Sequence, residues 1–118
     1  MIYTSYLAKL KQHPEWVTRF GNRIYFVMIG RGNNAVAPTL EMLTKYKVSK
    51  DWEGYEKEYV RRLQDSNAFS WMGRIAHIAH KEDVLLVCYE KSNEQCHRRL
   101  LAEEIQHLFD VPYMGELE

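Results

Sequence analysis

Five residues in one short stretch of the sequence have side chains of the types that thiol-based catalysis uses: Cys88, Glu90, Cys96, His97 and Arg98. A cysteine thiolate is a nucleophile, and histidine exchanges protons near neutral pH. Arginine binds carboxylate and phosphate groups through two parallel hydrogen bonds. The stretch therefore predicts a catalytic centre of two thiols, a carboxylate and an imidazole, with Arg98 binding an anionic substrate.

A predicted strand and a predicted helix must position these side chains. The segment Asp83–Glu90 is apolar on both faces, which is typical of a central strand in a parallel sheet. Alternation along this strand places Cys88 and Glu90 on one face. In the following helix, Cys96 precedes the apolar residue Leu100 by one turn, so its sulfur should point toward the sheet. We therefore expect the two sulfurs to lie close together.

The start of that helix adds positive electrostatic potential. Ser92 and Gln95 form a capping-box pattern, and the unpaired N–H groups of a first helical turn favour a thiolate or a bound anion. A carboxylate at the end of a buried strand needs a partner. We therefore expect Glu90 to be partly or fully buried and to accept a hydrogen bond or ion pair from Arg98 or Arg31.

Simpler structural interpretations remain open beside the catalytic one. Free cysteines often serve as small apolar packing residues, which would suffice for Cys88 and Cys96. Glu90 would then form a structural ion pair with Arg98 or Lys91.

A zinc site would use the two cysteines together with Glu90 and His97 as ligands. However, the chain lacks paired C-x-x-C spacing, and neighbouring residues on a helix point about 100° apart. It also lacks a C-x-x-C redox motif, a Walker A loop, a G-x-G-x-x-G fingerprint and an H-E-x-x-H motif. The sequence therefore predicts neither a metal nor a cofactor.

The rest of the chain alternates between strand and helix patterns. The further predicted strands are Ile2–Ser5 and Arg23–Ile29, and the predicted helical segments are Tyr6–Lys11, Pro38–Tyr46, Asp51–Leu63 and Ala68–His80. Strands that are separated by helical crossovers favour parallel, right-handed connections. We therefore expect an α/β fold, a small three-layer sandwich in which a largely parallel three- or four-stranded sheet is flanked by helices.

Parallel strands would bring three chain segments to one edge of the sheet. Thr4 and Ser5 end the first strand, Arg31 lies in the turn Gly30–Asn34 after the second, and the cysteine-bearing strand is the third. Ligands bind outside the carboxyl ends of parallel strands, so we expect the three segments to line one pocket. Thr4, Ser5 and Arg31 are therefore predicted, with Arg98, to bind the substrate.

The composition narrows the class of protein. The 118 residues are expected to form one α/β domain, residues 1–118, in which 16 Lys and Arg balance 16 Asp and Glu. A neutral chain has no overall field that attracts nucleic acid, so that partner would need a local patch and stays open, as does the oligomeric state. No apolar run reaches the roughly 20 residues of a membrane-spanning helix. The first residues also lack a signal-peptide pattern, so we expect a cytoplasmic protein with no membrane partner.

The spacing of the candidate site residues forms a distinctive string. Residues 86–91 are Leu-Val-Cys-Tyr-Glu-Lys, and Cys96-His97-Arg98 and Leu101-Ala102 follow. This C-Y-E-K…C-H-R…L-A string resembles the signature of the bacterial, archaeal and phage "domain of unknown function 488" family. The opening Ile2–Leu10 is similar to the family's N-terminus. The resemblance implies a compact α/β fold, points to the same five site residues, and implies no established activity.

Two functions of different classes follow from the same residues. The first is an enzyme that acts on a small anionic or nucleotide-like substrate, with Cys96 or Cys88 as nucleophile and Glu90 or His97 as proton carrier. The second is a non-catalytic module that binds a phosphate-bearing ligand or nucleic acid at the same helix N-terminus. The second function needs Arg98 but no thiolate.

Overall fold

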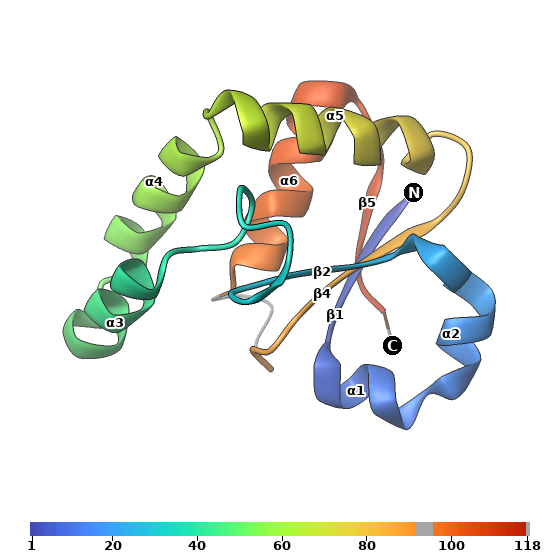
Figure 1. The fold of residues 1–118 in the computed structure, drawn as a ribbon, viewed down its shortest axis with the longest axis horizontal. Coiled ribbons are helices and arrows are strands. Elements are labelled where there is room, and N and C mark those ends of the chain that lie inside the picture. Colours follow the sequence, from blue (N-terminus) through green and yellow to red (C-terminus); the bar gives the residue numbers. More distant parts are fainter. Residues whose placement is uncertain (92–95, 118) are drawn as a thin grey trace.

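A five-stranded sheet forms the centre of the fold, with its strands in the order β3-β2-β4-β1-β5 (Figure 1). The computed structural model describes residues 1–91 and 96–117. The strands are β1 (Ile2–Tyr6), β2 (Ile24–Met28), β3 (Arg31–Gly32), β4 (Val84–Cys88) and β5 (Tyr113–Glu116). β1, β2, β4 and β5 run parallel, whereas β3 pairs with β2 in the antiparallel direction. The carboxyl ends of β1, β2 and β4 therefore lie at one edge, as expected.

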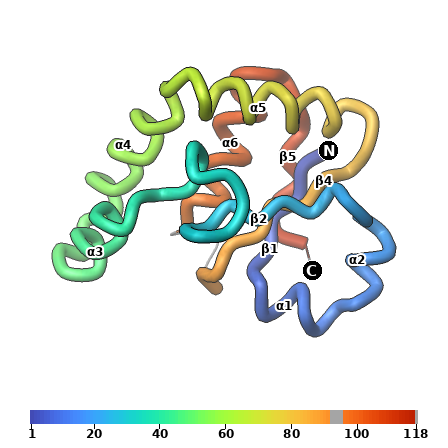
Figure 2. Tube along the Cα trace, in the orientation of Figure 1, coloured from blue at the N-terminus to red at the C-terminus, as the bar shows by residue number. Residues whose placement is uncertain are grey.

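Helices cover both faces of this sheet, so the predicted three-layer α/β architecture is confirmed. The helices are α1 (Leu7–Gln12), α2 (Pro14–Phe20), α3 (Leu40–Ser49), α4 (Trp52–Arg62), α5 (Ser66–Ala79) and α6 (His97–Phe109). α1 and α2 lie on one face, and α5 and α6 lie on the other (Figure 1). α3 and α4 extend beyond the sheet, and α4 packs against α6 (Figure 2). None of the described helices is long and apolar enough to cross a membrane.

The sheet has more strands than the three or four predicted. β3 contains only Arg31 and Gly32, and β5 contains a glycine with positive φ, Gly115. Neither segment shows the alternation of apolar and polar residues by which strands are recognised. These two edge strands form because β2 and β1 offer unpaired backbone groups.

The central strand β4 separates two apolar clusters. All five of its residues are fully buried, which explains the uninterrupted apolar run in the sequence. Val84, Leu86 and Cys88 face the cluster built with α5 and α6. Leu85 and Val87 face the smaller cluster built with α1 and α2. Cys88 therefore lies under α6, the helix that carries the other candidate residues.

Local signals explain most of the helix ends. Side chains of Thr39, Asp51 and Asp65 accept hydrogen bonds from the first turns of α3, α4 and α5. The start of α5 is thus capped by Asp65. Pro14 follows the end of α1 and occupies the first turn of α2, where its fixed φ suits a helix. The predicted capping box of Ser92 and Gln95 lies outside the described residues.

The turn after β2 requires glycine. Gly32 has a φ of +87°, and a Cβ there would lie 1.7 Å from the carbonyl oxygen of Phe26. Arg31 next to it is exposed, and its guanidinium lies 4.5 Å from the centre of the Phe26 ring. The close approach of this turn to β2 therefore directs Arg31 along the outside of the sheet.

Candidate functional site

The two cysteines are in direct contact, as the sequence predicts. Cys88 ends β4 and Cys96 precedes α6, and their Sγ atoms are 2.7 Å apart. Both side chains are buried and both thiols are free. Cys96 is the N-cap of α6, with extended backbone at φ −139° and ψ 142°, rather than a residue of the helix. This extended backbone turns the Cys96 sulfur back toward the end of β4.

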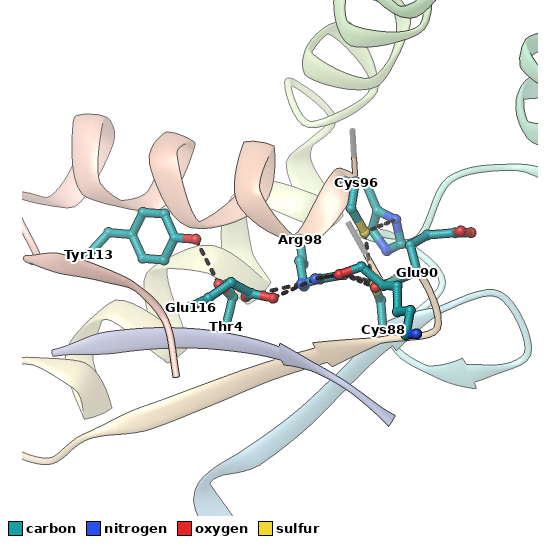
Figure 3. A network of polar contacts seen from close by, with 9 residues as sticks. Thr4, Cys88, Glu90, Cys96, Arg98, Tyr113 and Glu116 are labelled. Carbon is teal, nitrogen blue, oxygen red and sulfur yellow. Dashed lines mark hydrogen bonds and ion pairs between the residues drawn. The ribbon is translucent and has the colours of Figure 1, made fainter. Parts of the chain in front are cut away.

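Arg98 contacts the Cys88 sulfur of this thiol pair (Figure 3). Its Nη1 donates to Cys88 Sγ at 2.9 Å and to the carbonyl oxygen of Glu90 at 2.5 Å. Its Nη2 donates to the carbonyl oxygen of Lys91 and, at 2.5 Å, to Glu116 Oε1, and its Nε donates to Glu116 Oε2. All five N–H groups of the guanidinium are therefore engaged within the protein.

These contacts change the role that the sequence suggested for Arg98. The side chain is completely buried, and its charge is balanced by the carboxylate of Glu116 and by the Cys88 sulfur. An arginine in this state holds a thiolate and the chain after β4 in place. It has no N–H group left for a substrate anion unless one of these contacts breaks.

The predicted environment of Glu90 is wrong. Its side chain is exposed, and its carboxylate forms no ion pair or hydrogen bond with any residue in 1–91 or 96–117. The prediction extended strand alternation to Glu90, but β4 ends at Cys88. The carboxylate that pairs with Arg98 is Glu116, from β5, which lies beside β1 in the sheet.

His97 is a buried, neutral base beside Cys96. Its Nε2 lies 2.6 Å from the carbonyl oxygen of Val27, which can only accept, so Nε2 carries the proton. Its Nδ1 therefore presents a lone pair, and it lies 3.8 Å from Cys96 Sγ. Burial, helped by the charge of Arg98, lowers the pKa of His97 to about 4 against the opposing Val27 contact. The imidazole is neutral at physiological pH.

The two cysteines differ in how readily they lose a proton. Burial opposes ionisation of Cys88, but the hydrogen bond from Cys96, the charge of Arg98 and the N–H groups of Arg98 and Glu90 outweigh it, so the pKa of Cys88 lies below its ordinary value. Burial and the neighbouring negative charge raise the pKa of Cys96 far above its ordinary value. Cys88 is therefore the first of the pair to ionise, and its thiolate accepts a hydrogen bond from the Cys96 thiol.

Three other predicted substrate-binding residues lie away from this pair. Thr4 and Ser5 lie inside β1 rather than at its end, because the strand continues to Tyr6. Thr4 Oγ1 is 2.7 Å from the hydroxyl of Tyr113 (Figure 3), whereas Ser5 faces α1 and α2 on the opposite side of the sheet. Arg31 stacks on Phe26 and lies away from the thiols. The group of β2 that contacts a candidate site residue is the Val27 carbonyl, which accepts from His97. The expected single pocket of three segments is therefore wrong, although the strands are parallel.

A thiophilic metal would find three ligands here. Cys88 Sγ, Cys96 Sγ and one His97 nitrogen lie within 4.8 Å of one another. The objection that helical neighbours point apart does not apply, because Cys96 lies outside the helix. The sulfurs would have to separate by roughly 1 Å, because tetrahedral zinc with bonds of about 2.3 Å holds them about 3.8 Å apart. Glu90, with its exposed side chain, is not among these ligands.

A cavity of about 90 Å³ leads to the thiol pair. We call it the thiol cavity; its lining residues are Leu43, Tyr46, Lys47, Trp52, Tyr55, Glu90, Cys96 and His97. Cys96 thus faces the cavity, whereas Cys88 lies behind it. A larger open groove of about 1060 Å³ runs along α4 and α5, but neither cysteine nor His97 lines it.

Several residues of this site carried no functional signal in the sequence. Glu116 is distant in sequence from Arg98 and sits in an edge strand without alternation. Trp52 and Tyr55 belong to the predicted helical segment Asp51–Leu63, whose pattern indicates no binding role, yet both line the thiol cavity. A lysine at position 47 cannot be distinguished by pattern from other surface lysines.

The comparisons with known proteins bear on this same region. The family model described as "DUF488-N3a: Active DUF488-N3 subclade" matches residues 33–108. That range includes both cysteines, His97, Arg98 and every residue of the thiol cavity. No curated protein and no solved structure matches the chain.

Proposed function

The chain belongs to the DUF488-N3a family, and we propose that it is an enzyme acting on a small anionic or nucleotide-like substrate at the Cys88–Cys96 pair. One observation carries this proposal: Arg98 donates a hydrogen bond to Cys88 Sγ while Cys96 Sγ contacts the same sulfur. A cation and a second thiol together stabilise a thiolate, which is the reactive form of cysteine. The word "active" in the description of the matching family agrees with a catalytic role.

The position of the cavity supports different roles for the two thiols. Cys96 lines the thiol cavity and makes the first bond to the substrate, since Cys88 lies behind it. The Cys88 thiolate accepts the proton of Cys96 across the 2.7 Å contact as Cys96 attacks. His97 Nδ1 is a second acceptor for that proton, and Glu90 carries protons at the rim of the cavity. Arg98 is a positioning residue that holds the Cys88 thiolate.

The remaining walls fit the proposed substrate class. Tyr46, Trp52 and Tyr55 line the cavity, and the Trp52 and Tyr55 rings are stacked with centres 5.1 Å apart. Aromatic walls suit a planar ring such as a nucleobase. Lys47 lines the same cavity and supplies the positive charge that an anionic group requires, a role that Arg98 cannot fill while its donors are engaged.

A non-catalytic binding module remains the second candidate. The complete burial of Cys88 favours it, because a packing cysteine needs no access to solvent. In that case a phosphate-bearing ligand or nucleic acid would bind near the start of α6, and both thiols would be inert.

Alkylation of the reduced protein by iodoacetamide separates the two candidates. For an enzyme, we expect Cys96 to be modified in the folded protein. The rate should rise with pH around the ionisation of Cys88, at a midpoint below that of an ordinary thiol, because the Cys88 thiolate accepts the proton of Cys96. Arg98→Lys should raise that midpoint, because it removes one donor to the Cys88 sulfur. Thiols that react only when the protein unfolds would contradict the enzyme and favour the binding module.

Adenosine monophosphate is a suitable probe for the cavity in the same assay. We expect it to slow alkylation of Cys96, and we expect Lys47→Gln to weaken this protection. The matched control is Lys45→Gln, because Lys45 lies on the same helix but pairs with Glu58 and does not line the thiol cavity. Equal protection in both variants would contradict the role of Lys47.

A further inference from the structure

We propose that the thiol pair reduces a sulfur–sulfur bond in its substrate and passes through a Cys88–Cys96 disulfide. This inference rests on the proposed function and names its substrate class: an anionic compound, with a planar ring, that contains a disulfide or a related S–S bond. The two sulfurs already touch, at 2.7 Å, and no described residue separates them. A bond between them therefore requires no rearrangement of β4 relative to α6 beyond a small shift of the side chains.

The position of the cavity sets the order of events. Cys96 faces the thiol cavity, so it attacks one sulfur of the substrate's S–S bond while its proton moves to Cys88. The other sulfur fragment leaves as a thiolate, and a mixed disulfide between Cys96 and the substrate remains. This step breaks one S–S bond and forms another.

Cys88 completes the reaction. It attacks Cys96 Sγ from the side away from the cavity, and the second substrate fragment leaves and takes the proton from Cys88. Arg98 stabilises the Cys88 sulfur as a thiolate at the moment of attack, because its Nη1 already donates to that sulfur. The protein ends as a disulfide, and the substrate ends as one thiol and one thiolate. Two electrons have passed from the two cysteines to the substrate, and an added dithiol restores the reduced pair.

The proton count favours an S–S bond over other reducible bonds. Once Cys88 is ionised, the pair keeps the one proton on Cys96, 2.7 Å from the Cys88 sulfur, and the cleavage of a disulfide consumes one proton, so no external acid takes part. Reduction of a peroxide or an oxyanion releases hydroxide or oxide, which are poor leaving groups without an acid. The neighbouring imidazole is neutral and donates its only proton to the Val27 carbonyl, so it cannot supply that acid.

The test uses the reduced full-length protein and dithiobis-nitrobenzoate, an anionic aromatic disulfide whose released thiolate is coloured. We expect two coloured thiolates per protein molecule, and mass spectrometry should find a Cys88–Cys96 disulfide with no adduct. The variant Cys88→Ser should release only one and retain a stable mixed disulfide on Cys96. Cys96→Ser should react on the order of tenfold more slowly or not at all, because Cys88 does not face the cavity.

Two comparisons keep the outcomes distinct. The uncharged reagent dithiodipyridine should react more slowly with the wild-type protein, and Lys47→Gln should remove the preference for the anionic reagent. A wild-type protein that keeps one stable adduct, or that carries separate adducts on both cysteines, would overturn the dithiol cycle. If iodoacetamide still modified Cys96 rapidly in the reduced wild-type protein, the proposed function would stand while this inference fell. Circular dichroism of each serine variant confirms that the fold is retained.

Discussion

The two faces of the sheet are built on different principles. The face under α5 and α6 buries paired polar groups: Arg98 donates to Glu116 and to Cys88, and Thr4 contacts the Tyr113 hydroxyl. The face under α1 and α2 is a small apolar cluster, and the hydroxyl of Ser5 is a buried polar atom without a partner among the described residues. β1 and β4 contribute to both faces. Stability on the first face therefore depends on paired charges, and on the second it depends on buried apolar area.

The largest effect should come from breaking the charge network. Arg98→Met should lower the free energy of unfolding by about 3–5 kcal/mol, because Glu116 loses its partner and two carbonyl groups lose their donor. Urea unfolding measures this loss. The control is Arg99→Met, since Arg99 pairs with Glu103 on the surface and such pairs contribute only about 0.5 kcal/mol. Equal losses in both variants would show that the buried network contributes no more to stability than a surface ion pair.

The second effect is a loss of stability in acid. The pKa of His97 falls from 6.5 to about 4 on folding, so the unfolded chain binds the proton more readily. Stability from this group is complete above about pH 6.5 and is lost as pH falls toward about 4, by up to about 3 kcal/mol. His97→Gln should flatten this part of the curve of unfolding free energy against pH. His107→Gln, which alters an exposed histidine, should leave it unchanged.

A third and smaller effect concerns Thr4 on the polar face. Thr4→Val keeps the shape of the side chain but removes the hydroxyl that contacts the Tyr113 hydroxyl. We expect a loss of about 1 kcal/mol in urea unfolding, because this partly buried hydrogen bond is lost. The double variant Thr4→Val with Tyr113→Phe should recover much of that loss. No recovery would mean that the two hydroxyl groups do not act as a pair.

The difference between the faces also explains what the sequence could predict. The apolar run in β4 predicted a central strand, and the one-turn spacing to Leu100 predicted that Cys96 returns to Cys88. These inferences rest on periodicity, which is local. The pairing of Arg98 with Glu116 depends on β5 lying beside β1, a long-range contact between segments without a periodic signal.

The other features of the site that the sequence did not predict depend on the backbone. The Val27 carbonyl that fixes the tautomer of His97 has no side-chain signature. Likewise, Cys96 was expected within the helix, and only its extended φ and ψ show that it caps α6 instead. Glu90 was misplaced because the strand pattern continued past the point where β4 ends. Residue types therefore predicted the components of the site, while the pairing among them required the fold.

The smallest expected effect is the one that most sharply separates the two faces. Ser5 precedes Tyr6 in β1 and aligns with Val87, so its side chain points into the apolar cluster of Leu10, Phe20 and Val87. Its buried hydroxyl has lost its water without gaining a described partner. Ser5→Ala should therefore leave the unfolding free energy unchanged or raise it by up to about 1 kcal/mol. It should also leave iodoacetamide alkylation of Cys96 unaltered, because Ser5 lies across the sheet from the thiols. A loss of stability comparable to that of Thr4→Val would mean that the hydroxyl has a partner and that this face, too, depends on a buried hydrogen bond.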